Sequence, residues 1–276
     1  MKNARLIMNK DFLIAVDLDG TLVTDFDNYD HKSIRYLKKL AKTNYVVIAT
    51  GRPYRSTKPA YEMLELDTPI INYNGALVHN PSDYFFPKTI ITIDKQVIID
   101  LIKEKSDAII NVFCEVEDDI YLWKKDDQIR PFLHADGGNL AIGDPQDILH
   151  NDPNGAIIYA EAAKQEEISA YLKSKHDNID LRFWPIPDGL VLGEVYNAKT
   201  SKGKALKKVA HYYGIPDKKI IAFGDGHNDI DLLGSASVSV AMANGHPELL
   251  KTAKYITKSV ENNGVYYFLK KYFHRL

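Results

Sequence analysis

The chain has 276 residues, of which 45% are hydrophobic and 26% charged, so it can bury the core of one large domain or of two ordinary ones. Its 35 lysines and arginines nearly balance 37 aspartates and glutamates, and a net charge of -2 excludes an overall field that would draw it to nucleic acid or an anionic membrane. The single cysteine, Cys114, excludes an internal disulfide, and we expect it to be buried.

The hydrophobic stretches near the N-terminus are short. Leu6-Ile7-Met8 is interrupted by Asn9-Lys10-Asp11, which does not fit a secretory signal peptide. No apolar run approaches the roughly 18 residues that a membrane span needs. We therefore expect a cytoplasmic protein without a membrane or nucleic-acid partner.

Short apolar runs, each ending in small or polar residues, occur near both ends of the chain. We expect strands at Phe12–Asp17, Tyr45–Thr50, Pro69–Tyr73, Lys219–Gly224 and Val238–Ala241. Between them, Ser33–Lys42 and Ser201–Tyr213 carry apolar residues at helical spacing on one face. Apolar strands that alternate with amphipathic helices are typical of a parallel sheet covered on both faces. The pattern predicts a doubly wound, Rossmann-like α/β core.

The middle of the chain has a different pattern. Aromatic and β-branched segments predict strands at Tyr84–Ile93, Ala108–Val116, Gly155–Ala160, Asp180–Trp184 and Gly189–Tyr196, and helical spacing occurs at Lys95–Lys105 and Lys164–Lys175. We interpret residues 85–194 as an inserted α+β domain, which leaves residues 1–84 and 195–276 for a discontinuous core. The tail, Gly264–Leu276, is expected to form a terminal helix.

Two carboxylates follow the first predicted strand, in the segment Asp17-Leu18-Asp19-Gly20-Thr21. Parallel α/β sheets bind their ligands at the carboxyl ends of the strands, which is where Asp17 and Asp19 would lie. Taken alone, the segment also fits an ordinary turn that leaves a strand.

Polar residues at the ends of other predicted strands favour the functional interpretation. Thr50-Gly51-Arg52 closes the second strand, and Asp225-Gly226-His227-Asn228-Asp229 follows the strand that ends at Gly224. Because these strands are parallel, their ends are expected to converge on one edge of the sheet.

A lysine contributes to the same edge. Lys202 starts a helical stripe that continues with Leu206 and Val209, so its side chain is expected to face the core. The nearby Lys199 is the alternative, but it lies outside this stripe.

The charges at this edge indicate what the site binds. Asp17, Asp19, Asp225 and Asp229 would bring four carboxylates within several ångströms. Each pair of unit charges at about 4 Å repels by about 4 kcal/mol at an effective dielectric near 20, so a cation or protons must neutralise the cluster. Oxygen ligands select a hard ion such as Mg²⁺, which also accepts a phosphate oxygen. We infer a Mg²⁺ ion beside a phosphoryl group.

Together, Asp17-Leu18-Asp19-Gly20-Thr21, Thr50-Gly51-Arg52, Lys202 and Gly224-Asp225-Gly226-His227-Asn228-Asp229 resemble the four motifs of the haloacid dehalogenase-like (HAD) phosphatases. The large insertion, together with Asn72-Tyr73-Asn74-Gly75-Ala76 before it, resembles the Cof-type branch, whose members carry an α/β cap domain at this place.

The resemblance implies covalent catalysis. Asp17 would attack phosphorus to form an aspartyl-phosphate, and Asp19 would act as general acid and then as general base. The metal would be held by the Asp17 carboxylate, the backbone carbonyl of Asp19 and Asp225. The resemblance places Thr50, Gly51, Lys202 and Asn228 on the phosphoryl oxygens, and Asp229 behind the metal or Lys202 as an orienting residue.

The sequence therefore predicts a Mg²⁺-dependent phosphoric monoester hydrolase that acts on a small phosphorylated metabolite. Sugar phosphates are the first class we expect, followed by nucleotides, flavin mononucleotide and pyridoxal phosphate. Two alternatives remain, a phosphotransferase or phosphomutase of the same fold and a phosphate-binding module without turnover. The second alternative has no need of Asp19 as an acid and base. The sequence leaves the oligomeric state open.

Overall fold

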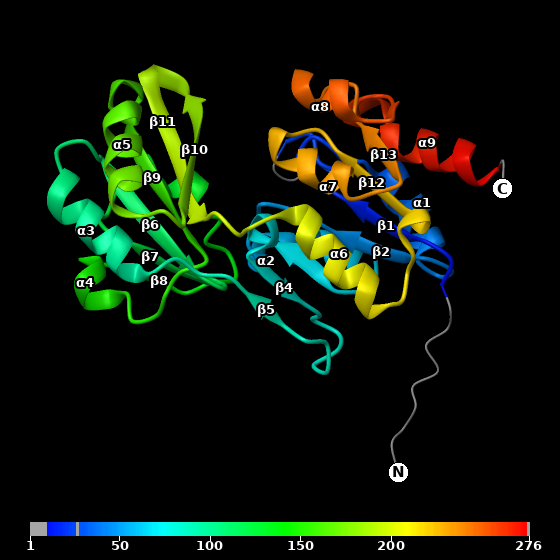
Figure 1. Cartoon of the computed structure of the whole chain (residues 1–276), viewed down its shortest axis with the longest axis horizontal. Coiled ribbons are helices and arrows are strands. Elements are labelled where there is room, and N and C mark those ends of the chain that lie inside the picture. Colours follow the sequence, from blue (N-terminus) through cyan, green and yellow to red (C-terminus); the bar gives the residue numbers. More distant parts are fainter. Residues whose placement is uncertain (1–9, 26–27, 275–276) are drawn as a thin grey trace, which may run out of the picture. The chain divides into compact units, whose positions relative to one another are not determined.

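The computed structural model describes residues 10–25 and 28–274, and it divides into two compact units (Figure 1). The first unit contains the chain up to Thr50, residues Ala60–Pro87 and the chain from Ser201 onward. The second unit contains Gly51–Pro59 and Lys88–Thr200. The chain thus crosses between the units four times, and each unit is described separately below.

The first unit is built on a five-stranded parallel sheet in the order β14-β13-β12-β1-β2. The strands are β1 (Leu13–Val16), β2 (Tyr45–Ile48), β12 (Ile220–Gly224), β13 (Val238–Ala241) and β14 (Tyr255–Ile256). Because β1 lies between β12 and β2, the residue after β1 emerges at the centre of the carboxyl edge. The predicted Rossmann-like parallel core is confirmed, and β14 is a strand that the sequence analysis missed.

The strand predicted at Pro69–Tyr73 forms as β3 (Ile70–Asn72), but it is not a full member of the parallel sheet. It pairs in antiparallel fashion with β4 (Leu77–His79) and meets the end of β2 through a single parallel bridge between Ala49 and Ile71. A tight turn joins β3 to β4, so β3 finds its partner in the next segment of the chain.

Helices cover both faces of the parallel sheet, as its alternating side chains require. On one face, Ala15 and Val47 share a cluster with Leu206 and Val209 of α6. On the other face, the ring of Phe223 packs 5.6 Å from that of Phe268 in α9. The helices of this unit are α1 (His31–Leu40), α6 (Lys202–Tyr212), α7 (Ile230–Gly234), α8 (Pro247–Thr252) and α9 (Gly264–Phe273), and α2 (Tyr54–Met63) begins in the second unit and ends in the first.

The second unit is a six-stranded, mostly antiparallel sheet in the order β10-β11-β9-β6-β7-β8. Its strands are β6 (Asn111–Val116), β7 (Asp119–Leu122), β8 (Leu140–Ile142), β9 (Gly155–Glu161), β10 (Ile179–Ile186) and β11 (Leu190–Asn197). Its helices are α3 (Lys95–Lys105), α4 (Pro145–Ile148) and α5 (Gln165–Lys175). This α+β arrangement agrees with the predicted insertion.

Side chains of β6 show how that sheet is packed. Cys114 lies in the cluster that contains residues of α3 and α5, whereas its neighbour Phe113 lies in a second cluster with Leu122 and Leu133. Cys114 is fully buried, as expected. Burial, with a smaller contribution from the charge of Glu115, raises the pKa of its thiol far above the ordinary range.

The strand expected over Tyr84–Ile93 is wrong for most of its length. Only β5 (Thr89–Ile90) is extended there, and Tyr84 and Phe85 lie in a turn with their side chains almost fully exposed. Aromatic residues are common in strands, which explains the prediction, but the segment directly follows the turn at Asn80-Pro81-Ser82 and forms a second turn.

Short 3-10 turns lie at Tyr73–Gly75 (η1), Arg130–Phe132 (η2), Ala162–Lys164 (η3), Pro187–Gly189 (η4), Asp217–Lys219 (η5), His227–Asp229 (η6) and Val260–Asn262 (η7).

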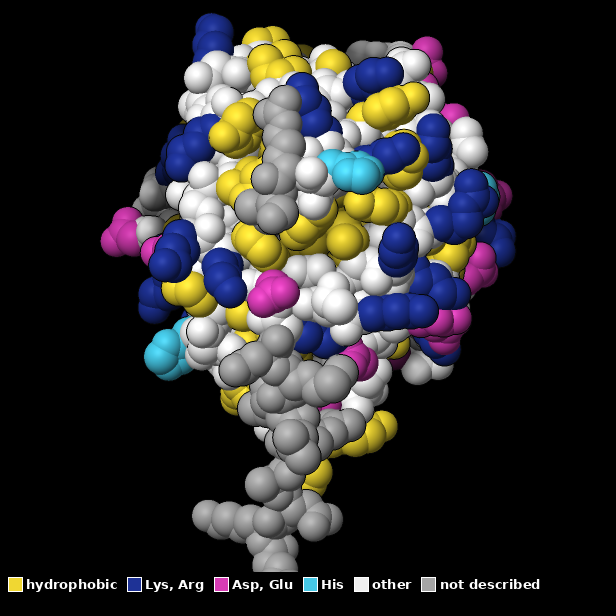
Figure 2. All heavy atoms as spheres, turned by 90° about the vertical axis from the view of Figure 1, so that its right-hand side faces the viewer, with side chains coloured by type: hydrophobic (Ala, Val, Ile, Leu, Met, Phe, Trp, Pro, Cys, Tyr) yellow, Lys and Arg dark blue, Asp and Glu magenta, His cyan; other side chains and the backbone are white. Residues whose placement is uncertain are grey.

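A groove of about 900 Å³ lies between β14 and α9 in the first unit. Tyr255, Phe268 and Tyr272 line it together with Lys258 and Lys270, and apolar side chains gather among lysines and arginines on this side of the molecule (Figure 2). None of the predicted site residues lines the groove, so it is separate from the chemistry described below. In the described part of the chain, no helix is long and apolar enough to cross a membrane.

Candidate active site

Asp17 is the first residue after β1, at the centre of the carboxyl edge of the parallel sheet. Its backbone N–H donates to the carbonyl of Phe223 over 3.1 Å, which continues the pairing between β1 and β12 for one more residue. The residue as a whole is 4% exposed. A carboxylate is rarely buried to this degree unless it is paired or holds a cation.

The partner of Asp17 is Lys202, the first residue of α6. Its Nζ lies 2.7 Å from Oδ1 of Asp17 and 2.7 Å from Oδ1 of Asp229, and the three side chains are 0%, 6% and 1% exposed. Burial alone lowers the pKa of Lys202, but the combined attraction of the two carboxylates outweighs it and holds the pKa above its ordinary value. Lys202 is therefore a permanent cation here.

Hydrogen bonds at the N-terminus of α6 fix the position of Lys202, the first residue of this helix. Ser201 is the N-cap, and its hydroxyl accepts from the N–H of Lys204 and donates to Asp231. Oδ2 of Asp231 also accepts from the N–H of Gly203 over 3.1 Å. These bonds satisfy the free amides of the first helical turn and anchor it to α7. Lys199, the alternative, has an exposed side chain.

Asp225 and Asp229 approach Asp17 from the loop after β12. Oδ2 of Asp229 accepts from the N–H groups of Asp225 and Gly226 over 3.0 and 2.9 Å, while its Oδ1 meets Lys202. Both oxygens of Asp229 are thus engaged, which suits a residue that orients the loop and the lysine. Oδ1 of Asp225 accepts only a longer bond, of 3.3 Å, from the hydroxyl of Thr21.

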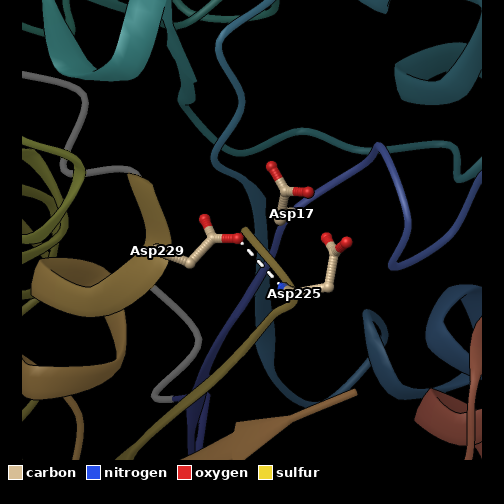
Figure 3. Close-up of side chains that lie close together, drawn as sticks. All are labelled: Asp17, Asp225 and Asp229. Atoms are coloured by element: carbon tan, nitrogen blue, oxygen red, sulfur yellow. Dashed lines mark hydrogen bonds between the residues drawn. The ribbon is translucent and has the colours of Figure 1, made fainter. Parts of the chain in front are cut away.

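Three carboxylates converge at this point (Figure 3): one oxygen from each of Asp17, Asp225 and Asp229 lies within 4.8 Å of the others. Burial, followed by the charge of Asp229, raises the pKa of Asp17 well above its ordinary value, and Lys202 offsets part of this effect. The same two causes raise the pKa of Asp225 to about 7. One lysine therefore does not balance two buried carboxylates and the half-buried Asp225, and the cluster has an excess of negative charge.

The cluster contains three carboxylates and not the predicted four. Asp19 is exposed, and its side chain is not part of the group that could surround one ion. The physical reason is that the chain bends at Leu18, directly before Asp19, so Asp19 does not continue the line of β1. Its charge still contributes to the raised pKa of Asp17, so it is near the site.

The other predicted residues lie around this edge. Thr50 follows β2, is fully buried and donates its N–H to the carbonyl of Ile71 over 2.9 Å. Gly51 comes next in the chain and is half-buried. Asn228 belongs to η6 and donates from Nδ2 to Oδ1 of Asn74 over 2.9 Å.

The sequence analysis missed Asn244 as part of the site. Its Nδ2 lies 2.9 Å from the carbonyl of Gly20 and 3.5 Å from Oδ2 of Asp225, and its Oδ1 accepts from the N–H of Val260. It therefore joins the loops after β1, β12 and β13. A signal existed, because Asn244 follows a predicted strand in the same way as the residues that were selected.

A family model for haloacid dehalogenase-like hydrolases matches residues 14–269. The chain belongs to the haloacid dehalogenase-like hydrolases. The chain is 36% identical over 267 residues to the 5-amino-6-(5-phospho-D-ribitylamino)uracil phosphatase YitU of Bacillus subtilis, a match that covers 96% of this chain and 98% of the relative. YwtE, a B. subtilis phosphatase with the same named substrate, is 27% identical and matches over 93% of this chain and 96% of its own.

A solved structure shares the fold of this chain. The crystal structure of a haloacid dehalogenase-like hydrolase from Bacteroides thetaiotaomicron matches with a TM-score of 0.79 at 22% identity, over 95% of this chain and 99% of that one. The resemblance drawn from the motifs is confirmed, and so is the prediction of a phosphatase, a hydrolase of phosphoric monoesters.

Proposed function

We propose that this protein is a Mg²⁺-dependent phosphatase of small phosphorylated metabolites that works through an aspartyl-phosphate on Asp17. The observation that carries the proposal is the buried group at the end of β1, in which Lys202 lies 2.7 Å from both Asp17 and Asp229 while Asp225 completes an acidic cluster. A buried carboxylate beside a fixed cation, with further carboxylate oxygens that can ligate a metal ion, is suited to bind and attack a phosphoryl group.

The residues present fit a divalent cation. The cluster offers oxygens only, and it has more buried negative charge than Lys202 neutralises. Asp17 and Asp225 would hold the ion, together with the backbone carbonyl of Asp19, and Asp229 would orient the ligands because its own oxygens are already engaged. When bound, Mg²⁺ would neutralise charge on the phosphoryl oxygens and keep both carboxylates ionised.

The protein's own residues would carry the reaction in two steps. Oδ1 of Asp17 is held by Lys202, so Oδ2 is the oxygen that forms a bond to phosphorus while the bond to the ester oxygen breaks. Asp19 gives its proton to the departing alkoxide. Asp19 then takes a proton from water, which bonds to phosphorus while the bond to Asp17 breaks, and orthophosphate leaves. Thr50, the Gly51 amide, Lys202 and Asn228 would hold the phosphoryl oxygens.

Sugar phosphates are the substrate class expected from the sequence, and the names of two relatives indicate a narrower class within it. YitU and YwtE are named for a substrate that carries phosphate on a ribityl chain attached to a pyrimidine. That phosphate is an alkyl monoester of a sugar alcohol, so it falls within the first class expected from the sequence. We propose 5-amino-6-(5-phospho-D-ribitylamino)uracil as the first substrate to test.

We further propose that residues 1–84 and 195–276 form the catalytic core, that residues 85–194 form the cap domain, and that the protein is located in the cytoplasm.

The test is orthophosphate release from a panel of sugar phosphates, ribityl phosphates and nucleotides, with Mg²⁺ or with EDTA. Asp17→Asn should abolish release, whereas Asp11→Asn is a matched control because Asp11 is exposed and precedes β1 where Asp17 follows it. Orthophosphate release by the Asp17→Asn variant would refute the role of Asp17 as the nucleophile.

Asp19 separates the hydrolase from a module that only binds phosphate. We expect Asp19→Asn to lower turnover by about 10²- to 10⁴-fold, the usual contribution of a general acid and base, with Mg²⁺ affinity unchanged. Equal turnover by the variant and the unaltered chain would rule out this role. Assays with and without an acceptor alcohol distinguish a hydrolase from a phosphotransferase, because only the latter transfers the group to the alcohol.

A further inference from the structure

The turn between β3 and β4 has an unusual backbone. Three consecutive residues, Tyr73, Asn74 and Gly75, have positive φ angles of 49°, 54° and 102°. Glycine and asparagine tolerate this region, but a buried tyrosine rarely adopts it. Such backbone persists only where its surroundings hold it in place, and it is concentrated at functional sites.

The turn contacts three segments, each of which carries a proposed phosphate-binding residue. The N–H of Asn74 donates to the carbonyl of Thr50 over 3.0 Å. Its side-chain Oδ1 accepts from Nδ2 of Asn228 over 2.9 Å. Gly75 packs against the N-cap of α6 so closely that an added Cβ would lie 2.4 Å from the carbonyl oxygen of Ser201, directly before Lys202. One turn therefore holds Thr50, Asn228 and the start of α6 in register.

We propose that Asn74 is a positioning residue that sets the carboxamide of Asn228 for phosphate. The Oδ1 of Asn228 lies against Gly226, where an added Cβ would be 2.3 Å away, and its Nδ2 faces Asn74. One N–H of Nδ2 is engaged by Asn74, which fixes the plane of the amide and leaves the second N–H to donate to a phosphoryl oxygen. Without the acceptor on Asn74, the Asn228 amide can rotate and present its oxygen to the anion.

This inference rests on the proposed function, because it assigns Asn228 to the phosphoryl group. Its test is Asn74→Gly, since glycine suits a φ of 54° and the change removes the side-chain acceptor without straining the turn. Asn263→Gly is the matched control. Asn263 also has a positive φ, of 56°, and donates one side-chain hydrogen bond, to Asp30 over 2.9 Å, but it contacts none of the proposed site residues.

We expect Asn74→Gly to raise KM for the best phosphomonoester by about 5- to 30-fold, and to raise the inhibition constant of orthophosphate by the same factor. We expect kcat to change less than twofold, because the hydrogen bond from Asn228 to the charged phosphoryl group is weakened equally in the ground state and in the transition state. In an Asn228→Ala background the same substitution should change KM less than twofold, because the group through which Asn74 acts is gone. Asn263→Gly should leave both constants unchanged. Asn74→Ala provides a second variant without the acceptor if the glycine variant does not fold.

The outcomes separate the two ideas. If the unaltered chain releases and binds phosphate but Asn74→Gly behaves as Asn263→Gly does, the positioning role is wrong and the proposed function stands. An undiminished effect of Asn74→Gly in the Asn228→Ala background would also overturn it, since Asn74 would then act by another route. If the unaltered chain neither hydrolyses a phosphomonoester nor binds orthophosphate, the proposed function fails and the positioning role fails with it.

Discussion

Replacing Lys202 by methionine tests the electrostatic structure of the site most directly. The substitution keeps most of the volume of the lysine stem but removes the cation that lies 2.7 Å from Asp17 and 2.7 Å from Asp229. The two carboxylates then face each other in a buried site without a counter-charge. Removing one partner of a buried ion pair is far more destabilising than removing an exposed one, because the remaining charge is left uncompensated.

The size of the loss follows from the cheapest way to neutralise the site. At 2.7 Å each ion pair is worth about 6 kcal/mol at an effective dielectric near 20, so leaving both carboxylates ionised is prohibitive. Protonating one carboxyl with an ordinary pKa of about 3.9 costs about 4 kcal/mol at pH 7 and about 1.5 kcal/mol at pH 5. We therefore expect Lys202→Met to lower the free energy of unfolding by about 3–4 kcal/mol at pH 7 and by about half of that at pH 5.

The measurement is urea denaturation in EDTA at both pH values, followed by circular dichroism. Lys204→Met is the control on the same helix, since Lys204 is exposed, and it should change stability by less than about 0.5 kcal/mol. A loss below about 1 kcal/mol for Lys202→Met at pH 7, or a loss of equal size at pH 5, would refute the reasoning.

Further predictions concern three other residues, Asp225, Gly20 and Cys114. The pKa of Asp225 is raised to about 7 by burial and by Asp229, so the folded chain binds protons that the unfolded chain releases, and the metal-free protein should lose stability as the pH rises from about 4 to 7. Because protons and cation compete, Mg²⁺ affinity measured by calorimetry should rise up to about tenfold per pH unit between pH 5 and 7 and then level off, and a constant affinity would contradict this. Gly20→Ala should weaken Mg²⁺ binding at least about tenfold, because a Cβ would lie 2.0 Å from Oδ2 of Asp225 at a backbone φ of +73°; an unchanged titration would refute it. Cys114 should resist a thiol reagent in the native protein and react only in denaturant, because it is fully buried and its pKa is raised, so rapid native labelling would show that this core opens.

Sequence patterns alone predicted the fold class, and they predicted which polar side chains gather at one edge of the parallel sheet. A short, β-branched apolar run such as Tyr45–Ile48 favours a strand buried on both faces over a helix, because it is too short for a helix. Polar residues placed directly after such strands fall at one edge because parallel strands share a direction. The helical stripe from Lys202 through Leu206 and Val209 predicted a lysine that faces inward, because a period of 3.6 residues assigns each position to a face.

Tertiary structure decided what local pattern does not encode. Asp19 follows Asp17 by two residues yet lies outside the acidic cluster, because the chain bends at Leu18 between them. Asn74 and Asn244 reach the site through contacts with residues that lie 154 and 224 positions away in the chain, and local periodicity does not encode such contacts. The raised pKa of Asp225 likewise depends on burial and on charges that only the folded chain brings together.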